Sequence, residues 1–600
     1  MTSFSFKLKN ALHWLDNHLL IIICGFLLAF IPLYPKIPLW SPIEQYIVRV
    51  RLEDFFIVVA VIVWGIQVLR KKVAWVSPML WMIMAYAVIG LISSLVAIFV
   101  IKTVPLQPLH VEKTFLHYFR YLEYFSLYVM MYSAVRRRSD LIAGISILVS
   151  TVFAISVYGY GQRYFYWPVY STMNREFSKG IKLYLTEFAR VQSTFAGHYD
   201  MAAYLVVVLP IVLAFAFQVK RNILKAALYV TFWLGTWLLI LSASRTAFAA
   251  FMVGVMIVIF TTSLTKLNWA HRAAFVVSRI LVFGLLSSIL FYYFGSDLTA
   301  RLNYVVNSQP QLKKITETLT VQRQKLISDK TLAMLPLSPT QLQKMLPKGQ
   351  PPRSGESPDA AAAAAAATKN VASHADQPPS VAVKPSPTPT ASPKPSSDLN
   401  ALLPGDVHDD TPEPIMVATV SATGQITYIS KTRKRVYSKC ALEKELSLCI
   451  RQETLWPRAI EGFLTNPLTG SGYATLTKEN VDQFTEADST DNNFLRTLGE
   501  TGILGFATFY GCIGIILYIT ARHIRDRDYI VSGYSIGLLG GSIGLLLNAV
   551  YIDVFAASKV AQSYWAIAGL LLGYLAIRQR EQAQLRKVTA STHVTNQKSR

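Results

Sequence analysis

Two arginines, Arg190 and Arg245, lie next to apolar runs that are long enough to be membrane helices. Arginine is always charged, and its planar fork matches phosphate oxygens in a bidentate way that lysine does not. Two such forks at the same membrane depth would suit the diphosphate group of a lipid carrier. For either arginine alone, a side chain that snorkels at the membrane surface is the better interpretation.

A second pair of ionisable residues, Arg120 and Glu123, lies inside the apolar segment FLHYFRYLEYFSLYVMM. Their spacing places both on one face of a helix, where they can pair. Ionisable groups are costly inside a membrane, and they therefore indicate function. This pair predicts one wall of a charged cavity near the outer leaflet. An ion pair that locks two helices together is the alternative.

A third polar region precedes the last apolar runs. The segment Arg451–Tyr473 predicts an amphipathic helix that ends at the breaker Asn466-Pro467. Gly470 and Gly472 then predict a turn.

Five polar residues follow this turn. Asp491, Asn492 and Asn493 suit the N-cap of a helix whose first turns carry Arg496 and Glu500. Capping explains one of these residues and leaves the rest of the polar cluster unexplained. We therefore expect this cluster to contribute to a site.

The composition assigns these residues to a membrane protein. The chain of 600 residues is 52% hydrophobic and only 16% charged, with a mean hydropathy of +0.36, whereas soluble chains carry about a quarter charged residues. Apolar runs of bilayer-spanning length predict an all-α polytopic membrane protein of about twelve helices. The first run is expected to be retained, since no cleavage site follows it. The runs lie near 18–34, 54–69, 78–100, 115–135, 141–160, 201–218, 227–243, 246–262, 273–294, 503–520, 532–551 and 562–577.

These runs divide the chain into four parts. A membrane domain with nine helices occupies 1–294, a large loop occupies 295–500, three further membrane helices occupy 501–577, and a basic tail occupies 578–600. No phosphate-binding loop, dinucleotide fingerprint or zinc-ligand spacing occurs in the sequence. No metal and no cofactor is therefore expected.

The net charge of +23 lies mostly on short strips between the runs. These strips, which include Arg136–Arg138 and Arg522/Arg525/Arg527, hold 22 basic and 5 acidic residues, whereas the loop 295–500 holds 22 basic and 21 acidic residues. The positive-inside rule predicts that both termini are cytoplasmic and that the large loop is outside. The basic excess therefore indicates orientation and not nucleic-acid binding.

The large loop is heterogeneous. Residues 336–415 contain 16 of the 28 prolines and an alanine run, a composition that cannot bury a core and predicts disorder. Alternation over 416–439 predicts a β-hairpin. Cys440 and Cys449 follow on the oxidising side of the membrane, where they predict a disulfide. A pair of buried free thiols is the alternative.

Four segments, in this order along the chain, resemble the O-antigen ligase and O-antigen polymerase family. The resemblance covers nearly the whole chain except the insert at about 303–440. The matching segments are RVQSTFAGHYDMAAYLVVVLP (Arg190–Pro210), LSASRTAF (Leu241–Phe248), Arg451–Tyr473, which ends in NPLTGSGY, and DNNFLRTLGETGILG (Asp491–Gly505).

The resemblance implies a lipid-carrier-dependent membrane glycosyltransferase with twelve helices and a large outer loop. Such an enzyme moves a glycan from undecaprenyl diphosphate to an acceptor sugar hydroxyl at the outer membrane face, in the assembly of lipopolysaccharide or another surface polysaccharide. It implies a bacterial inner membrane location and no requirement for a metal. It also implies that Arg190 and Arg245 grip the diphosphate, and we add Arg451 as a third candidate for this role.

One position departs from the family pattern. Ligases of the family place a histidine where this sequence has Asn492, and a neutral amide cannot accept a proton. The candidates for the general base are therefore Asp491, Glu500 and His198, with Asn492 and Asn493 lining the cavity. A polymerase-like member fits this departure better than a lipid A-core ligase.

Two other classes of function stay open. Twelve helices are also common in transporters, and a flippase of lipid-linked glycans is one alternative. A family member without catalytic activity that acts as a scaffold is the other. Transfer of a glycan to an acceptor distinguishes the enzyme from both.

Overall fold

The computed structural model describes most of the chain outside the large loop. The described residues are 2–43, 48–172, 175–186, 189–265, 268–295, 413–420, 426–433, 440, 446–476 and 489–598. The chain divides into two compact units. The first comprises Met1–Thr331 and Ser447–Arg600, and the second comprises Leu332–Leu446.

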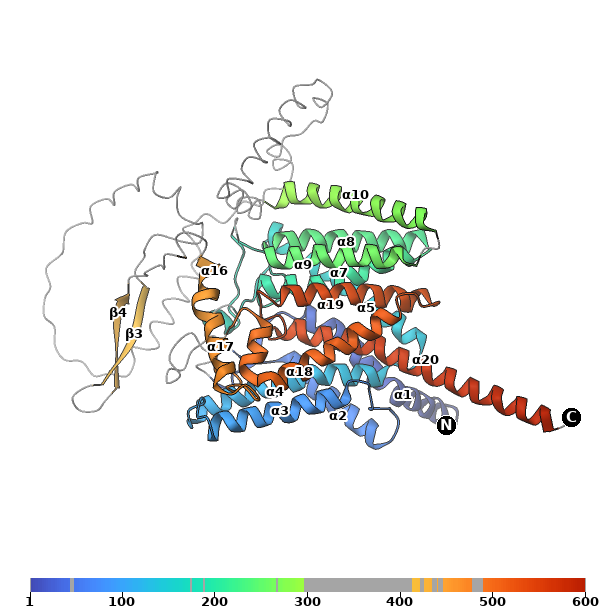
Figure 1. Ribbon diagram of the computed structural model, residues 1–600, viewed down its shortest axis with the longest axis horizontal. Helices are drawn as coiled ribbons and strands as arrows, with labels where there is room; N and C mark the ends of the chain where they lie inside the picture. Colours follow the sequence, from blue (N-terminus) through green and yellow to red (C-terminus); the bar gives the residue numbers. More distant parts are fainter. Residues whose placement is uncertain are drawn as a thin grey trace, which may run out of the picture. The chain divides into compact units, whose positions relative to one another are not determined.

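The first unit is a bundle of long helices (Figure 1). A short antiparallel pair of strands, β1 (Pro38–Trp40) and β2 (Val50–Arg51), lies between its first two helices. The helices of the first part are α1 (Thr2–Leu33), α2 (Leu52–Leu69), α3 (Leu80–Phe99), α4 (Pro108–Ala134), α5 (Arg138–Tyr164), α6 (Arg175–Ser178), α7 (His198–Gln218), α8 (Asn222–Leu241), α9 (Arg245–Ser263) and α10 (Trp269–Phe294). After the large loop come α16 (Leu446–Ile450), a π-helical turn (Arg451–Leu455), α17 (Trp456–Thr465), α18 (Asn493–Arg522), α19 (Tyr529–Asn548) and α20 (Ser558–Lys598).

Eleven helices of the described chain are long and apolar enough to cross a membrane. The chain is therefore a polytopic helical membrane protein. The sequence predicted twelve spans, and the difference is α4. This helix is continuous over 27 residues, but Glu112, Lys113, Arg120 and Glu123 make it more polar than the other long helices. It packs against α3 and α20, and every residue over 127–134 is buried.

The centre of the bundle is formed by α7, α19 and α20, whose membrane-spanning parts are almost entirely buried. Helices α7 and α19 approach each other closely because α19 carries glycines on the shared face. A Cβ atom on Gly541 would lie 2.3 Å from the carbonyl oxygen of Val207. Small residues of this kind allow two membrane helices to pack backbone against backbone.

Both chain termini lie at one end of the bundle (Figure 1). We call this the terminal end and the other the loop end. Ion pairs at the terminal end join α2 to α1 through Arg70 and Asp16, and α5 to the α18–α19 turn through Arg138 and Asp528. Two of the predicted basic strips therefore form ion pairs with acidic residues of neighbouring segments.

The described part of the second unit contains a β-hairpin. Strands β3 (Glu413–Val420) and β4 (Ile426–Arg433) pair antiparallel, with Val420 opposite Ile426 and Glu413 opposite Arg433. The strands begin slightly earlier than the sequence predicted, β4 extends to Arg433, and residues 434–439 of the predicted hairpin lie outside the described residues. The rest of the predicted disordered segment, 336–412, lies outside the described residues.

The four cysteines fall into two classes. Cys440 and Cys449 are disulfide-bonded, in agreement with the prediction from their spacing. Cys24 and Cys512 are free and buried in helices, where they act as small apolar packing residues.

Candidate functional site

Arg190 lies in a non-helical segment that leads into α7. Its Nη1 atom donates to Nε2 of His198 over 3.1 Å, and His198 is the first residue of α7. Because an arginine can only donate, Nε2 of His198 accepts in this contact. His198 therefore helps to position Arg190. The lone pair on Nε2 that His198 would need as a general base is occupied by this hydrogen bond.

The backbone after Arg190 is held by α5 and α8. The hydroxyl of Ser193 donates to the carbonyl of Ile155 over 2.7 Å, and the amide of Gln162 donates to the carbonyl of Ser193 over 2.9 Å. The backbone N–H of Val191 donates to the carbonyl of Leu241 at the end of α8 over 3.3 Å. These bonds fix the segment at the loop end of the bundle.

Arg245 is the first residue of α9 and is exposed. It follows the tight turn that begins at Ser242, in which Ala243 has a φ of 51°. Since Leu241 precedes this turn, the bond from Val191 joins the two motifs that carry Arg190 and Arg245. The structure thus brings both predicted arginines to connected segments at the loop end.

Lys559, a buried lysine that no sequence pattern indicated, also contacts the Arg190 segment. The ammonium group of Lys559, in the first turn of α20, donates to the carbonyls of Pro32, Tyr34 and Thr194 over 3.1, 2.6 and 2.8 Å. It also lies 4.9 Å from the ring centroid of Phe195, in a cation–π contact. Lys559 therefore connects the ends of α1 and α20 to the segment.

A second buried lysine, Lys36, lies next to this position. Its ammonium group contacts Oε1 of Glu53 at 3.1 Å and donates to the hydroxyl of Ser558 over 2.6 Å. Burial, with a further contribution from the charge of Arg51, lowers the pKa of Lys36 to about 8. Lys36, Glu53 and Lys559 each lie within a few residues of a predicted apolar run, and the sequence offered no other signal for them.

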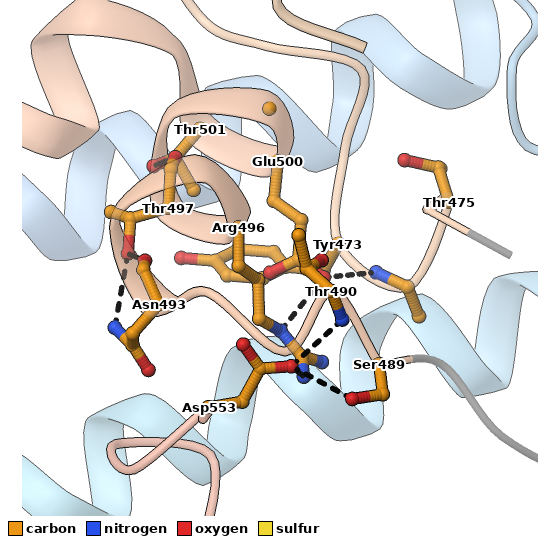
Figure 2. A network of polar contacts seen from close by, with 12 residues as sticks. Tyr473, Thr475, Ser489, Thr490, Asn493, Arg496, Thr497, Glu500, Thr501 and Asp553 are labelled. Carbon is orange, nitrogen blue, oxygen red and sulfur yellow. Dashed lines mark hydrogen bonds and ion pairs between the residues drawn. The ribbon is translucent and has the colours of Figure 1, made fainter. Parts of the chain in front are cut away.

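Arg496 lies between two carboxylates, Glu500 and Asp553 (Figure 2). Its Nη1 atom is 3.0 Å from Oδ2 of Asp553, and its Nε atom is 3.4 Å from Oε1 of Glu500. Arg496 and Glu500 are almost completely buried. Oε1 of Glu500 also accepts from the backbone N–H of Ala474 over 3.1 Å. These contacts give Glu500 a structural role, since a buried carboxylate that is paired and hydrogen-bonded is a poor base.

The predicted glycine turn docks on this network. Gly470 and Gly472 both have positive φ, 73° and 98°, the conformation that glycine adopts without strain. The N–H of Ser471 donates to the carbonyl of Gly499 over 2.8 Å, and that of Gly472 to the carbonyl of Glu500 over 3.0 Å. The turn after α17 is therefore fixed to the first turns of α18.

Asn492 and Asn493 are engaged in local structure. Asn492 is the N-cap of α18, and its side chain accepts from the N–H of Leu495 over 3.0 Å. The side chain of Asn493 is fully buried, donates to the hydroxyl of Tyr510 and accepts from the N–H of Phe555. These contacts do not indicate the predicted place of Asn492 and Asn493 on a cavity wall. Both amides instead stabilise the start of α18.

Asp491 and Arg451 form an ion pair, with 3.0 Å between Oδ2 and Nη2. Arg451 also donates to the carbonyl of Ser447 over 2.8 Å. The side chain of Asp491 is 35% exposed, whereas His198 is 6% and Glu500 1% exposed. Of the three predicted bases, Asp491 is therefore the one that a substrate hydroxyl can reach.

Arg120 and Glu123 contact other helices. Nη2 of Arg120 lies 3.9 Å from Oδ2 of Asp54 in α2, and Oε1 of Glu123 accepts from the amide of Gln562 in α20. Each residue therefore ties α4 to a different neighbour. These contacts fit the alternative prediction, in which the charged residues hold helices together, better than the predicted cavity wall. The partners come from α2 and α20, and Arg120 and Glu123 do not pair with each other in these contacts.

The loop 549–557 between α19 and α20 connects the two groups of candidate residues. Within it, Asp553 binds Arg496 of α18. Directly after it, Lys559 binds the carbonyl of Thr194 in the Arg190 segment. The starts of α7 and α18 are thus held on either side of one short loop at the loop end of the bundle. A scan against protein-family models and a search of curated proteins find no match to this chain.

Proposed function

We propose that the protein is a membrane glycosyltransferase that moves an oligosaccharide from undecaprenyl diphosphate to an acceptor sugar hydroxyl. The observation that carries the proposal is the hydrogen bond from Val191 to Leu241, because it joins the segments of Arg190 and Arg245 at one end of the bundle. The family resemblance of these two segments supplies the substrate class. In this proposal the chain lies in a bacterial inner membrane, with the loop end outside and both termini in the cytoplasm.

The chemistry needs a bond to form between the acceptor oxygen and the anomeric carbon while the bond to the diphosphate oxygen breaks. The electron pair of the breaking bond goes to the leaving diphosphate, whose growing charge the guanidinium groups of Arg190 and Arg245 stabilise. His198 orients Arg190 through the contact at Nη1, so that the charge is in place before the reaction begins. Fixed donors of this kind lower the barrier because they need no reorganisation.

The acceptor hydroxyl must lose its proton during transfer. Asp491 is the partly exposed carboxylate among the predicted bases, and its ion pair with Arg451 orients it. Arg451 in this proposal positions the base, since its guanidinium is already engaged with Asp491 and Ser447. The acceptor oxygen would deliver its proton to Oδ1 of Asp491, which in the structure accepts from the hydroxyl of Ser489 over 2.7 Å.

Reconstitution of the full chain into liposomes tests the proposal. The liposomes contain an undecaprenyl-diphosphate-linked glycan with a radioactive label, and a sugar acceptor is supplied on the loop side. We expect label to move to the acceptor with the wild-type chain, and transfer to fall by about 10² or more with Arg190→Ala or Arg245→Ala. Lys182→Ala removes an exposed cation from the same loop and is expected to leave transfer unchanged.

The same assay separates the alternatives. Movement of the intact labelled lipid across the bilayer without transfer would identify a flippase and contradict the proposal. Absence of both activities from a folded wild-type chain would favour a scaffold. Equal loss of transfer in Lys182→Ala would show that general surface charge, and not the two arginines, supports the reaction.

A further inference from the structure

A cavity of about 660 Å³ opens at the terminal end of the bundle, between the end of α18, the middle of α20 and the turn that follows α18. This volume is in the range of pockets that bind small ligands. The cavity lies far along the chain from the candidate site: α18 starts at the loop end and reaches this cavity with its last turn. Its polar lining includes Arg522, Arg525, Arg527, Asp526 and Arg578.

The acidic residues near the cavity are already neutralised. Oδ1 of Asp526 lies 2.8 Å from Nη1 of Arg578. Asp528 receives two hydrogen bonds from Arg138, each of 3.0 Å, and this contact lowers the pKa of Asp528. Neither carboxylate is therefore available to neutralise the remaining arginines.

Three arginines of the lining, Arg522, Arg525 and Arg527, have no acidic partner within the described part of the chain. Arg522 is held in place by Tyr518, one turn earlier. Its Nη1 atom donates to the Tyr518 hydroxyl over 2.9 Å, and its guanidinium lies 5.5 Å from the centre of that ring. The side chain is thus oriented by a neutral partner, and its positive charge stays uncompensated.

Apolar side chains share the lining with these arginines. They are Ile519 of α18, Leu572, Leu575 and Ala576 of α20, and Pro78 before α3. A lining that combines arginines with aliphatic side chains matches a molecule with an anionic phosphate at one end and hydrocarbon at the other. A free phosphate would contact only the arginines, and it would leave the apolar side chains in contact with water.

We propose that this cavity binds the headgroup and the upper acyl chains of an anionic phospholipid. Basic pockets between membrane helices bind such headgroups because the arginine fork matches phosphate oxygens and the surrounding leaflet supplies the ligand. The positive-inside tendency accounts for arginines at this end of the bundle. It does not account for a cavity that combines apolar side chains with three arginines that have no acidic partner in the described part of the chain.

Native mass spectrometry of the full-length protein, delipidated in detergent, tests this site by titration with phosphatidylglycerol. The test variant is Arg522→Gln/Arg525→Gln/Arg527→Gln. The matched control is Lys220→Gln/Arg221→Gln/Lys225→Gln, which removes the same charge from the α7–α8 turn and the first turn of α8, outside the cavity lining. We expect the Kd for phosphatidylglycerol to rise by about tenfold or more in the test variant, and by less than about twofold in the control.

Three further arms decide the outcome. Tyr518 is exposed, and Tyr518→Phe removes only the hydroxyl that holds Arg522. This variant is expected to weaken lipid binding measurably without unfolding the chain. Phosphatidylcholine is expected to bind no better to the wild type than to the test variant. The proposal is overturned if the control variant loses as much affinity as the test variant, if the test variant binds like the wild type, or if millimolar inorganic phosphate displaces the lipid.

Discussion

The backbone N–H of Val191 donates to the carbonyl oxygen of Leu241 over 3.3 Å. This bond joins the segment that begins at Arg190 to the turn that precedes Arg245, although all of α7 and α8 lies between them in the sequence. A Cβ atom on Gly159 of α5 would lie 2.5 Å from Leu238 and 3.4 Å from Val191. The three elements therefore meet with no room for a larger side chain at this position.

Removal of Arg496 should destabilise the protein strongly. Arg496→Ala leaves the carboxylates of Glu500 and Asp553 buried without their cation, and breaking a buried ion pair in this way costs about 3–5 kcal/mol. Thermal unfolding of the purified protein in detergent measures the effect, with exposed Lys182→Ala as the charge-matched control. Equal unfolding midpoints for Arg496→Ala and the control would show that the network contributes nothing to stability.

The close packing of α7 and α19 predicts a steric effect at Gly541. Gly541→Ala places a Cβ atom 2.3 Å from the backbone carbonyl of Val207, and overpacking of this kind costs about 1–3 kcal/mol. Gly514→Ala in α18 is the matched control, since nothing lies within 4 Å of its added Cβ. It should stabilise its helix by up to about 1 kcal/mol. If Gly541→Ala unfolds at the same temperature as Gly514→Ala, the close packing of α7 against α19 at Gly541 is contradicted.

Burial of Lys36 predicts a pH dependence of stability. Its pKa is lowered to about 8 in the folded protein, against about 10.4 in an unfolded chain. Between these values the unfolded state binds more protons, so the free energy of unfolding rises as the pH increases from about 8 to 10.4, by on the order of 3 kcal/mol. Below pH 8 this gain is absent.

Thermal unfolding of the wild type and of Lys36→Met over this pH range measures the contribution. The difference in stability between the two proteins should change with pH, because only the wild type carries this titration. Lys182→Met retains Lys36 and should follow the wild-type curve. A constant offset between the wild type and Lys36→Met would show that Lys36 has an ordinary pKa.

Asp491 should carry the base function. Asp491→Asn keeps the shape of the side chain but removes its ability to accept a proton, and loss of a general base costs about 10²–10⁴ in rate. Asn492→Asp is the control, because an aspartate can still cap α18 through the oxygen that accepts from Leu495. Transfer at the wild-type rate by Asp491→Asn would assign the proton to another acceptor.

The helical architecture was predictable because hydrophobic length is a local property of the sequence. The exception, α4, combines a continuous helix with Arg120 and Glu123, whose partners Asp54 and Gln562 come from α2 and α20. A pattern within one segment cannot reveal partners in another. The i,i+3 spacing therefore predicted a pair where the structure has two separate ties between helices.

The candidate site was predictable only in its named motifs. The sequence indicated Arg190 and Arg245, but nothing local indicated that Lys559 would bind the carbonyl of Thr194 across the bundle. Buried cations satisfied by backbone carbonyls have no sequence pattern of their own. Asn493 was interpreted as a site residue because it is a polar residue in a motif, but its side chain is buried and bonds to Tyr510 of α18 and to Phe555 of the α19–α20 loop.

We propose that Arg190 and Arg245 act on one diphosphate, and a double-mutant cycle of the transfer rate tests whether they do. The wild type, Arg190→Gln, Arg245→Gln and the double variant are reconstituted with labelled donor and acceptor, and each is first shown to unfold at the wild-type temperature. If both guanidinium groups stabilise the same leaving group, each single variant loses about 10²–10³ in rate and the double variant loses much less than the product of the two. Transfer at the wild-type rate by either single variant would contradict the claim.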